Sequence, residues 1–388
     1  MRRLPIIPFR LSLETHMLDF FSISLPLLAL LLFVPLIGIL EAMVPWLVKD
    51  RECFAVTIPS AAARDPRLVA YKRMYSIVMV VAAVIAFAVC LPIASGDANR
   101  LGIVILVTTF AQIGLGFLLM LAFRQRVRAI KRVEGWEAEA AESVAVSIDD
   151  LPRPLPLRWE WLHVAIIAAS LALTWALYPQ MPDQIIQHVD FNGMPTDYMP
   201  KSPMSALFPV AVTAFMAAIM TCSHAMIVRS KRPVDPESPA TSSLAYALFA
   251  RMQSIVLYAS GILLTSVIGL SMPLAFAEVV PMDVMGSFVI VAVLVIVLAS
   301  VWVAVVYGQS GARAIKQDVA SGAMPMDEDR MWLAGIFYCN PYDPSIIVPK
   351  RFGVGWTINV GRPGGWAIIV GLLVVSVAFV IGVGVLVD

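Results

Sequence analysis

Long apolar stretches alternate along the chain with short polar segments. A spanning helix needs roughly 20 apolar residues, because the hydrocarbon core of a bilayer is about 30 Å thick. The stretches are continuous rather than alternating, which favours helices over a β-barrel. Eight of them are long enough: 22–47, 74–94, 101–123, 159–178, 204–228, 252–272, 285–307 and 366–387. The pattern predicts an all-α integral membrane protein, a polytopic bundle of about eight transmembrane helices.

The composition agrees with this class. Of 388 residues, 60% are apolar and 14% charged, whereas soluble domains carry about 25% charged residues. A net charge of +1 suggests neither nucleic acid nor an acidic substrate as a partner. The high apolar fraction makes the lipid bilayer the expected partner. The four cysteines form no close pair, so we expect neither disulfides nor a zinc site. The apolar segment from Phe20 to Val48 is too long for a signal-peptide core, so we interpret it as a retained span.

Lysine and arginine predict the orientation in the membrane, because cytoplasmic loops carry an excess of them. Four polar segments, 48–73, 124–158, 229–251 and 308–365, hold 23 of the 28 basic residues. We therefore expect these segments in the cytoplasm of a prokaryotic cell, with the protein in its plasma membrane. Both termini and the polar loop 178–202 should then be extracytoplasmic, although the basic N-terminal arm argues against this assignment.

The loop between the fourth and fifth spans is dense in turn-formers and polar residues. Pro179 and Pro182 end the fourth span, an Asn-Gly pair supplies a turn, and His188 and Asp190 alternate like strand neighbours. A mere connector needs no such pattern. The candidate binding residues in this loop are His188, Asp190, Asn192, Gly193, Asp197 and Lys201.

Three interpretations of this loop remain open: a recognition surface, a self-satisfied structural loop, and a hard-cation site that includes Asp183 and Asp197. A metal site normally needs three or four convergent ligands. Since only one imidazole is present, we assign no metal ligands.

The segment 323–366 before the last span is aromatic, β-branched and punctuated by Gly and Pro. We expect one or two short strands and tight turns there, at the cytoplasmic membrane surface. The candidate binding residues in it are Asn340, Asp343, Lys350, Arg351, Trp356 and Asn359. An interfacial structural plug is the alternative to a ligand or partner contact. Residues 54–59 echo 352–357, which suggests that both segments lie on one face of the protein.

Two resemblances follow from these residues. The loop pattern Met181-Pro182-Asp183, Ile185 to His188, Asp190, Gly193, Pro195-Thr196-Asp197 and Lys201 resembles domain of unknown function 1648, found in SdpI-type immunity membrane proteins. The chain departs from that pattern at Ile186, where a proline is expected, and at Val189, where an aromatic is usual. The residues Tyr338, Asn340-Pro341, Asp343-Pro344, Val348 to Gly353, Gly355-Trp356-Thr357 and Asn359 are similar to domain of unknown function 5808.

The chain therefore divides into three parts. Residues 1–150 form a three-span bundle with a charged linker, and residues 151–322 hold the family-core spans with the extracytoplasmic loop. Residues 323–388 comprise the short β- and turn-rich cytoplasmic segment and the last span.

The span interiors carry few ionisable residues. We expect no Asp, Lys or Arg in any span interior, and Glu41, near the inner end of the first span, as the only carboxylate there. His163 and His224 lie near span ends, where we expect them to be structural. Ion coupling usually needs buried ionisable groups. No zinc-protease, nucleophile-elbow or phosphate-loop motif occurs, so we expect neither catalytic residues nor cofactors.

The resemblance implies an immunity or sensing protein that binds a peptide toxin or membrane-active agent and relays this to a cytoplasmic regulator. A transporter for an apolar or zwitterionic solute is the alternative. A membrane enzyme that uses His188 with nearby carboxylates is the weakest hypothesis.

Overall fold

A computed structural model describes residues 25–94, 98–138, 151–190, 194–315, 324 and 327–387. Eight of its helices are long and apolar enough to cross a membrane, which confirms the predicted class and number of spans within this part of the chain. They are α2 (Leu25–Leu47), α3 (Pro66–Ala94), α4 (Ala98–Val133), α5 (Trp161–Leu177), α7 (Phe208–Val228), α8 (Pro239–Phe276), α9 (Met282–Tyr307) and α10 (Pro363–Val387).

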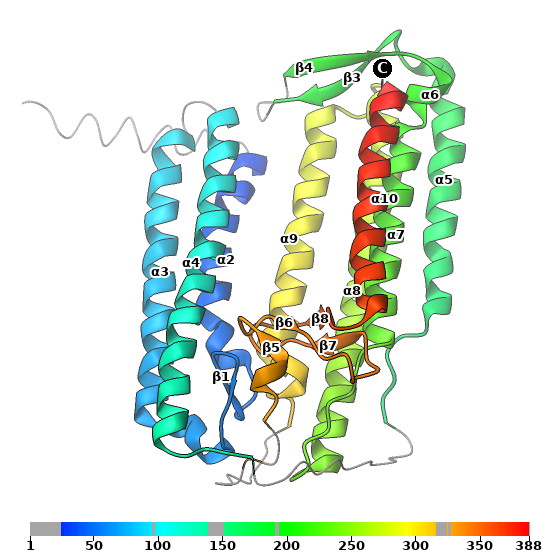
Figure 1. Ribbon diagram of the computed structural model, residues 1–388. Helices are drawn as coiled ribbons and strands as arrows, with labels where there is room; N and C mark the ends of the chain where they lie inside the picture. Colours follow the sequence, from blue (N-terminus) through cyan, green and yellow to red (C-terminus); the bar gives the residue numbers. More distant parts are fainter. Residues whose placement is uncertain are drawn as a thin grey trace, which may run out of the picture.

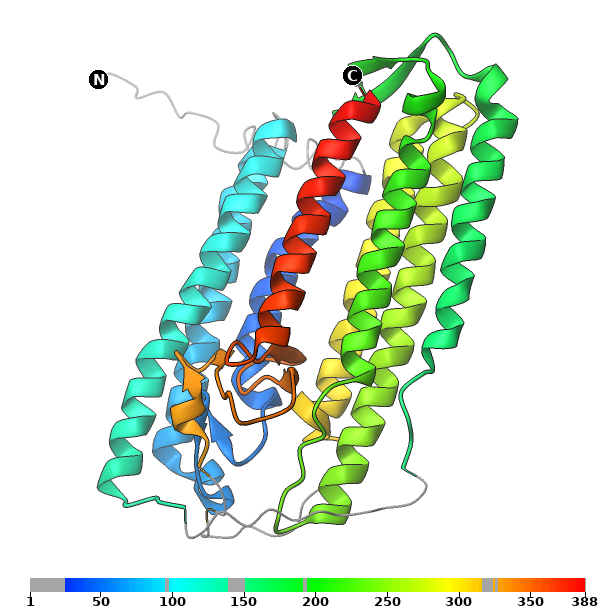
Figure 2. The ribbon, with the colours of Figure 1, turned by 45° about the vertical axis from the view of Figure 1, so that its right-hand side comes forward.

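The helices form two groups that stand side by side (Figures 1 and 2). In the first bundle α2 packs against α3 and α4, and in the second α8 packs against α5, α7 and α9, with α10 beside α7. Helix α2 also packs against α9, which joins the bundles. Large apolar side chains such as Ile77, Phe110 and Ile381 remain more than half exposed, as expected of helices that face lipid.

Several helices run beyond the predicted apolar stretches. Helix α4 continues to Val133, past the apolar stretch that ends at residue 123, and α8 begins at Pro239, well before the apolar stretch that begins at residue 252. Proline is well tolerated at the first helical position because its missing N–H has no partner there. At 38 residues, α8 is about 57 Å long, so it projects past a bilayer core.

Short strands lie at both ends of the helices. At one end β3 (Gln184–Val189) and β4 (Pro195–Pro200) form an antiparallel hairpin, here called the outer hairpin. The opposite end holds three smaller hairpins: β1 (Glu52–Cys53) with β2 (Val56–Thr57), β5 (Trp332–Leu333) with β6 (Phe337–Tyr338), and β7 (Ile347–Pro349) with β8 (Trp356–Ile358). The segment 323–366 thus holds four short strands, more than the one or two predicted.

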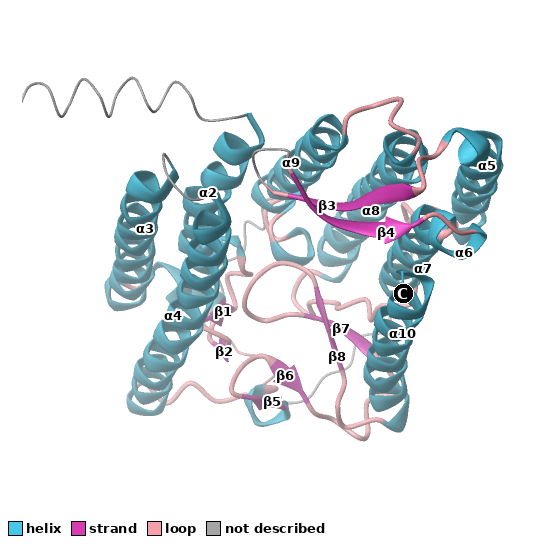
Figure 3. Cartoon of the chain, turned by 90° about the horizontal axis from the view of Figure 1, so that it is seen from above, coloured by secondary structure: helices cyan, strands magenta, loops and turns pink. Residues whose placement is uncertain are grey.

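The two patterned segments lie at opposite ends of the bundle (Figure 1). Viewed along the helices, β5 to β8 lie between the first bundle and the helices α7 and α10 (Figure 3). The start of α2 and the end of α10 both lie at the same end of the bundle as the outer hairpin. Which end faces the cytoplasm stays a prediction from the basic residues.

Candidate functional site

The segment 327–361, here called the clasp, binds the first bundle through a buried carboxylate. Asp329 Oδ1 accepts hydrogen bonds from the backbone N–H and the hydroxyl of Thr57, at 2.9 and 3.1 Å. Its Oδ2 lies 2.7 Å from Lys131 Nζ at the end of α4, and Arg351 Nη1 donates to Oδ1 at 2.6 Å. Burial opposes the charged form, but these contacts outweigh it and hold the pKa of Asp329 below its usual value.

Aromatic packing supports the same junction. The Phe352 ring of the clasp stacks on Phe54 with a centroid distance of 5.9 Å and meets Tyr75 edge-on. Phe54 and Ala55 both have positive φ in the two-residue turn between β1 and β2, as a tight hairpin turn requires. The contact confirms that the two echoing segments lie on one face of the protein.

The clasp binds the second bundle through other residues. Trp356 Nε1 donates to the Tyr246 hydroxyl (3.1 Å), and its ring packs on Phe249 of α8. The fully buried amide of Gln309 donates to the backbone carbonyls of Lys350 and Gly355 and accepts from the Gly355 N–H. One continuous segment therefore holds both bundles.

Asp343 forms a further tie to the second bundle. Its Oδ2 lies 2.6 Å from Lys231 Nζ and accepts from the Tyr338 hydroxyl at 2.9 Å, while Oδ1 accepts from the Ser345 N–H. Burial acts against the carboxylate, but these donors lower the pKa of Asp343 to about 2. Asp343 is thus ionised at neutral pH and holds the α7–α8 connection.

Asn359 organises the interior of the clasp. Its side chain is fully buried, and its Nδ2 donates to the carbonyls of Asn340 (2.8 Å) and Ser345 (3.1 Å). Its Oδ1 accepts from the N–H groups of Asn340 and Gly361. Asn340 in turn caps the N–H of Tyr342, as Asn before Pro does in turns. The structure places these two predicted binding residues in the framework of the clasp.

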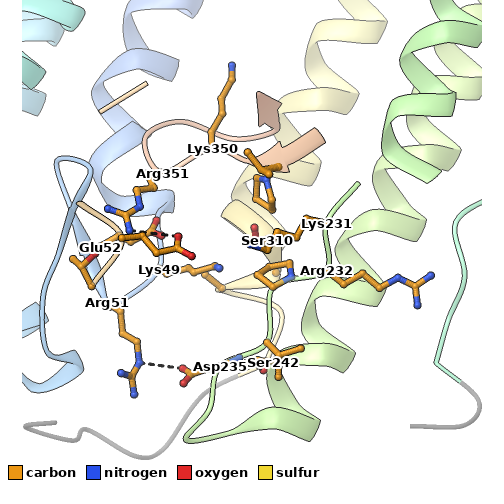
Figure 4. Close-up of a pocket in the computed structure, with 18 of the residues that line it drawn as sticks. Lys49, Arg51, Glu52, Lys231, Arg232, Asp235, Ser242, Ser310, Lys350 and Arg351 are labelled. Atoms are coloured by element: carbon orange, nitrogen blue, oxygen red, sulfur yellow. Dashed lines mark hydrogen bonds and ion pairs between the residues drawn. The ribbon is translucent and has the colours of Figure 1, made fainter. Parts of the chain in front are cut away.

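A cavity of about 470 Å³ opens where the clasp, the first bundle and the α7–α8 connection meet (Figure 4). Ligand cavities typically measure about 300–1,000 Å³. Six basic and four acidic side chains line it: Lys49, Arg51, Lys231, Arg232, Lys350 and Arg351, with Asp50, Glu52, Asp235 and Glu328. The predicted residues Lys350 and Arg351 are among them.

The charges in this cavity are only partly paired. Arg51 binds Asp235 at 3.0 Å and also Glu237, and Arg351 is bound by Asp329. Lys49 makes no ion pair with any residue that the structure describes. In Figure 4 the side chains of Arg232 and Lys350 point out of the cavity. The side chain of Lys49 lies inside it, between Glu52 and Lys231.

Four polar atoms of the cavity lining are buried without a hydrogen bond among the described residues: Arg51 Nη1, Glu52 Oε2, Ser310 Oγ and Trp332 Nε1. Buried polar groups are nearly always paired in native proteins. Burial also raises the pKa of Glu52, which favours its protonated, donating form. Donors therefore outnumber acceptors, and the cavity suits an acidic group.

The outer hairpin places its candidate residues differently. His188 and Asp197 are exposed cross-strand partners, and no hydrogen bond joins these two described side chains. Asp190 closes the turn by accepting from the Met194 N–H (2.9 Å). Lys201 folds back to donate to the Met181 carbonyl and lies over the Tyr178 ring. Asn192 and Gly193 lie outside the described residues.

The expectation for the span interiors was wrong. Glu160 lies within the candidate span Leu157–Gln180 and is buried against His163 and His224, so Glu41 is not the sole carboxylate. The sequence did carry a signal, because Glu160 and His163 are three residues apart and share a helix face. The cavity residues from residue 49 to 52 and from 231 to 235 were also missed, since their proximity depends on tertiary packing.

Two family models match parts of the chain. Residues 165–213 match a domain of unknown function (DUF1648), and residues 341–366 match a family of unknown function (DUF5808). No curated protein and no solved structure matches the chain. The matches confirm both resemblances. The first includes the outer hairpin and the second includes most of the clasp.

Proposed function

We propose that the chain is a multi-pass plasma-membrane protein of immunity or sensing type. The outer hairpin binds an extracytoplasmic peptide toxin or another membrane-active agent, and the clasp end relays this to a cytoplasmic regulator. The observation that carries the proposal is the clasp, a single segment that holds both bundles around a partly unpaired charged cavity. A change in the angle between the bundles must change this cavity.

The two ends suit different partners. The hairpin exposes His188 and Asp197, which leaves both side chains available to a bound agent. The cavity offers Lys49, Trp332 Nε1 and Arg51 Nη1, and neither of the last two atoms has a hydrogen-bond partner among the described residues. Charge-assisted hydrogen bonds of this kind bind carboxylates strongly, so an acidic segment of a regulator fits the cavity.

Survival of expressing cells against a panel of membrane-active peptides tests the proposal. His188→Ala and Asp197→Ala should each lower protection because they remove exposed polar groups from the hairpin. Lys49→Ala should lower it as well, because it removes a cation of the cavity that has no ion pair with the described residues. Thr196→Ala, at an exposed position of the same strand, is the matched control. All variants need equal membrane levels by immunoblot, and unchanged protection across the panel contradicts the proposal.

One observation favours a transporter as second candidate. The cavity lies between two helical bundles and carries both signs of charge, which suits a zwitterionic solute. Flux of zwitterionic solutes into proteoliposomes tests this function. Flux that Lys49→Ala abolishes would support it, whereas absence of flux across a broad solute panel would remove it.

A further inference from the structure

A cluster of ionisable groups is buried among α5, α7 and α8 of the second bundle. Glu160 immediately precedes α5, and its carboxylate Oε1 lies 2.5 Å from His224 Nδ1 on α7. Oε2 accepts a hydrogen bond from the Thr221 hydroxyl at 2.9 Å. The side chain of His224 is fully buried and that of Glu160 is 9% exposed. Ionisable groups inside a membrane domain are costly and usually functional.

His163 adds a second imidazole to the same carboxylate. Its Nε2 lies 3.3 Å from Glu160 Oε2, and its Nδ1 lies 3.2 Å from the Thr265 hydroxyl on α8. The Thr265 hydroxyl donates to the Gly261 carbonyl at 2.8 Å, so it accepts from the imidazole. The network therefore assigns a proton to Nδ1 of His163 and leaves its Nε2 facing the carboxylate.

The Nε2 atoms of both histidines are buried and make no hydrogen bond among the described residues. The Nε2 of His163 faces the carboxylate, whereas His224 meets the carboxylate through Nδ1. Each imidazole thus has a ring nitrogen without a hydrogen bond to the described residues, which is open to a proton. The described His, Cys, Asp and Glu side chains include no group of three arranged to hold a metal ion. The phenol of Tyr258 on α8 completes the titratable groups here, with its ring 6.5 Å from each imidazole.

Charge balance sets the number of protons. With both imidazoles neutral, an ionised Glu160 would bury a net charge of −1, which is expensive in a low-dielectric interior. One proton, shared between the carboxylate and the imidazoles, makes the cluster neutral. A second would give it a net positive charge at the same cost.

We propose that Glu160, His163 and His224 form a proton-binding site that holds one exchangeable proton and couples its presence to the packing of α5 against α7 and α8. Three helices contribute to the site, so loss of the proton weakens contacts among all three. The proposal is independent of the ligand assigned to the cavity at the clasp end.

Helix packing around the site is tight. A Cβ atom added at Gly261 would lie 3.2 Å from the His163 ring and 3.1 Å from Met220 Cβ, so the glycine makes room for the imidazole. At Gly286 on α9, an added Cβ meets no atom within 4 Å. These two positions provide a matched pair of substitutions.

The melting temperature of the full chain in nanodiscs, followed from about pH 5 to about pH 9, tests the site. The wild-type value should fall on the alkaline side, because loss of the shared proton leaves a buried net charge. Glu160→Gln should flatten that step, since its amide is neutral at every pH. His188→Gln, on the exposed hairpin, should retain the wild-type step. A Glu160→Gln profile with the wild-type step would overturn the proposal.

Two further variants keep the test decisive if Glu160→Gln fails to fold. Thr221→Val removes a donor to the ionised carboxylate, so the midpoint of the step should move to higher pH by roughly half a unit. Gly261→Ala should also displace the midpoint, because it pushes the His163 ring, whereas Gly286→Ala should not. Unchanged midpoints in both Thr221→Val and Gly261→Ala would refute the site.

Discussion

The outer hairpin and the clasp are built from similar residues, yet the hairpin exposes its polar side chains and the clasp buries them. Both segments combine Asn, Asp, Gly and Pro with a basic residue. In the hairpin His188 and Asp197 are exposed, whereas in the clasp Asn359 is fully buried and Asp343 is 9% exposed. Whether the polar residues of such a segment stay exposed or bond within it depends on how many other elements pack around the segment.

The packing beneath each segment explains the difference. The hairpin buries Ile185 and Met199 against residues of its own bundle, such as Phe276 and Met282, so its other face remains free. The clasp lies between two bundles and contacts Phe54 on one side and Phe249 on the other. A segment enclosed on both sides must satisfy its polar groups internally.

Among the substitutions that test this comparison, Asn359→Ala should have the largest effect on the stability of the clasp. The substitution removes the fully buried side chain that bonds partly buried backbone groups of Asn340, Ser345 and Gly361, at a cost of about 3 kcal/mol in the stability of the clasp. Local opening of the clasp should then increase about a hundredfold.

Labelling of Cys53 measures this opening, because that thiol is fully buried in the core on which Phe352 packs. Burial raises its pKa to about 11, so it should react slowly in the closed state. The measurement uses a Cys222→Ser/Cys339→Ser background. The matched control is Thr196→Ala in the hairpin, and equal labelling rates in both variants would show that Asn359 does not hold the clasp.

A smaller effect should come from Asp343→Asn, and it should depend on pH. The pKa of Asp343 is lowered from 3.8 to about 2, so its ionised form stabilises the folded clasp by about 2 kcal/mol at neutral pH. This contribution is complete above about pH 5 and is lost as the pH falls from about 4 towards 2.

Thermal unfolding of Asp343→Asn and wild type at pH 7 and at about pH 3 measures this contribution. The difference in melting temperature should be clear at pH 7 and should shrink at about pH 3. Lys231→Met removes the partner cation and should lower stability over the same pH range. A pH-independent difference would mean that the Lys231 contact does not depend on the charge of Asp343.

The smallest effect on stability should come from the hairpin. His188→Ala and Asp197→Ala alter exposed side chains, so each should change the free energy of unfolding by no more than about 0.5 kcal/mol. Denaturant titration in detergent micelles measures this change. A loss above about 1 kcal/mol at either position would make the hairpin a structural element like the clasp and would weaken its role as a binding surface.

Sequence reasoning succeeded where local chemistry decides the outcome. Continuous apolar runs predicted the eight spans found in the described part of the chain. The strand-like alternation of His188 and Asp190 agrees with the position of His188 in β3, although Asp190 lies just beyond that strand. Tight turns were predicted in the segment 323–366, and Asn340 and Asp343, each followed by a proline, both accept hydrogen bonds from the backbone N–H two residues ahead. In each case the responsible interactions lie within a few residues in the chain.

It failed where partners are far apart in sequence. Arg51 meets Asp235 across 184 residues and Thr57 meets Asp329 across 272, so neither the cavity nor the junction has a local signature. Glu160 was overlooked because His224 lies on another helix. The start of α8 was also predicted too late, because its first residues are polar and belong to no long apolar run.

Helix α8 touches both ends of the molecule. Its Phe276 belongs to the core beneath the outer hairpin, and its Phe249 packs on Trp356 of the clasp. Hydrogen-bonded helices resist compression along their axis, and the proline inside α8, Pro273, lies within one turn of Phe276. The helix between Pro273 and Phe249 can therefore transmit an axial displacement. A ligand that shifts the hairpin by an ångström could thereby move Trp356 by a similar distance, without any intervening loop having to rearrange.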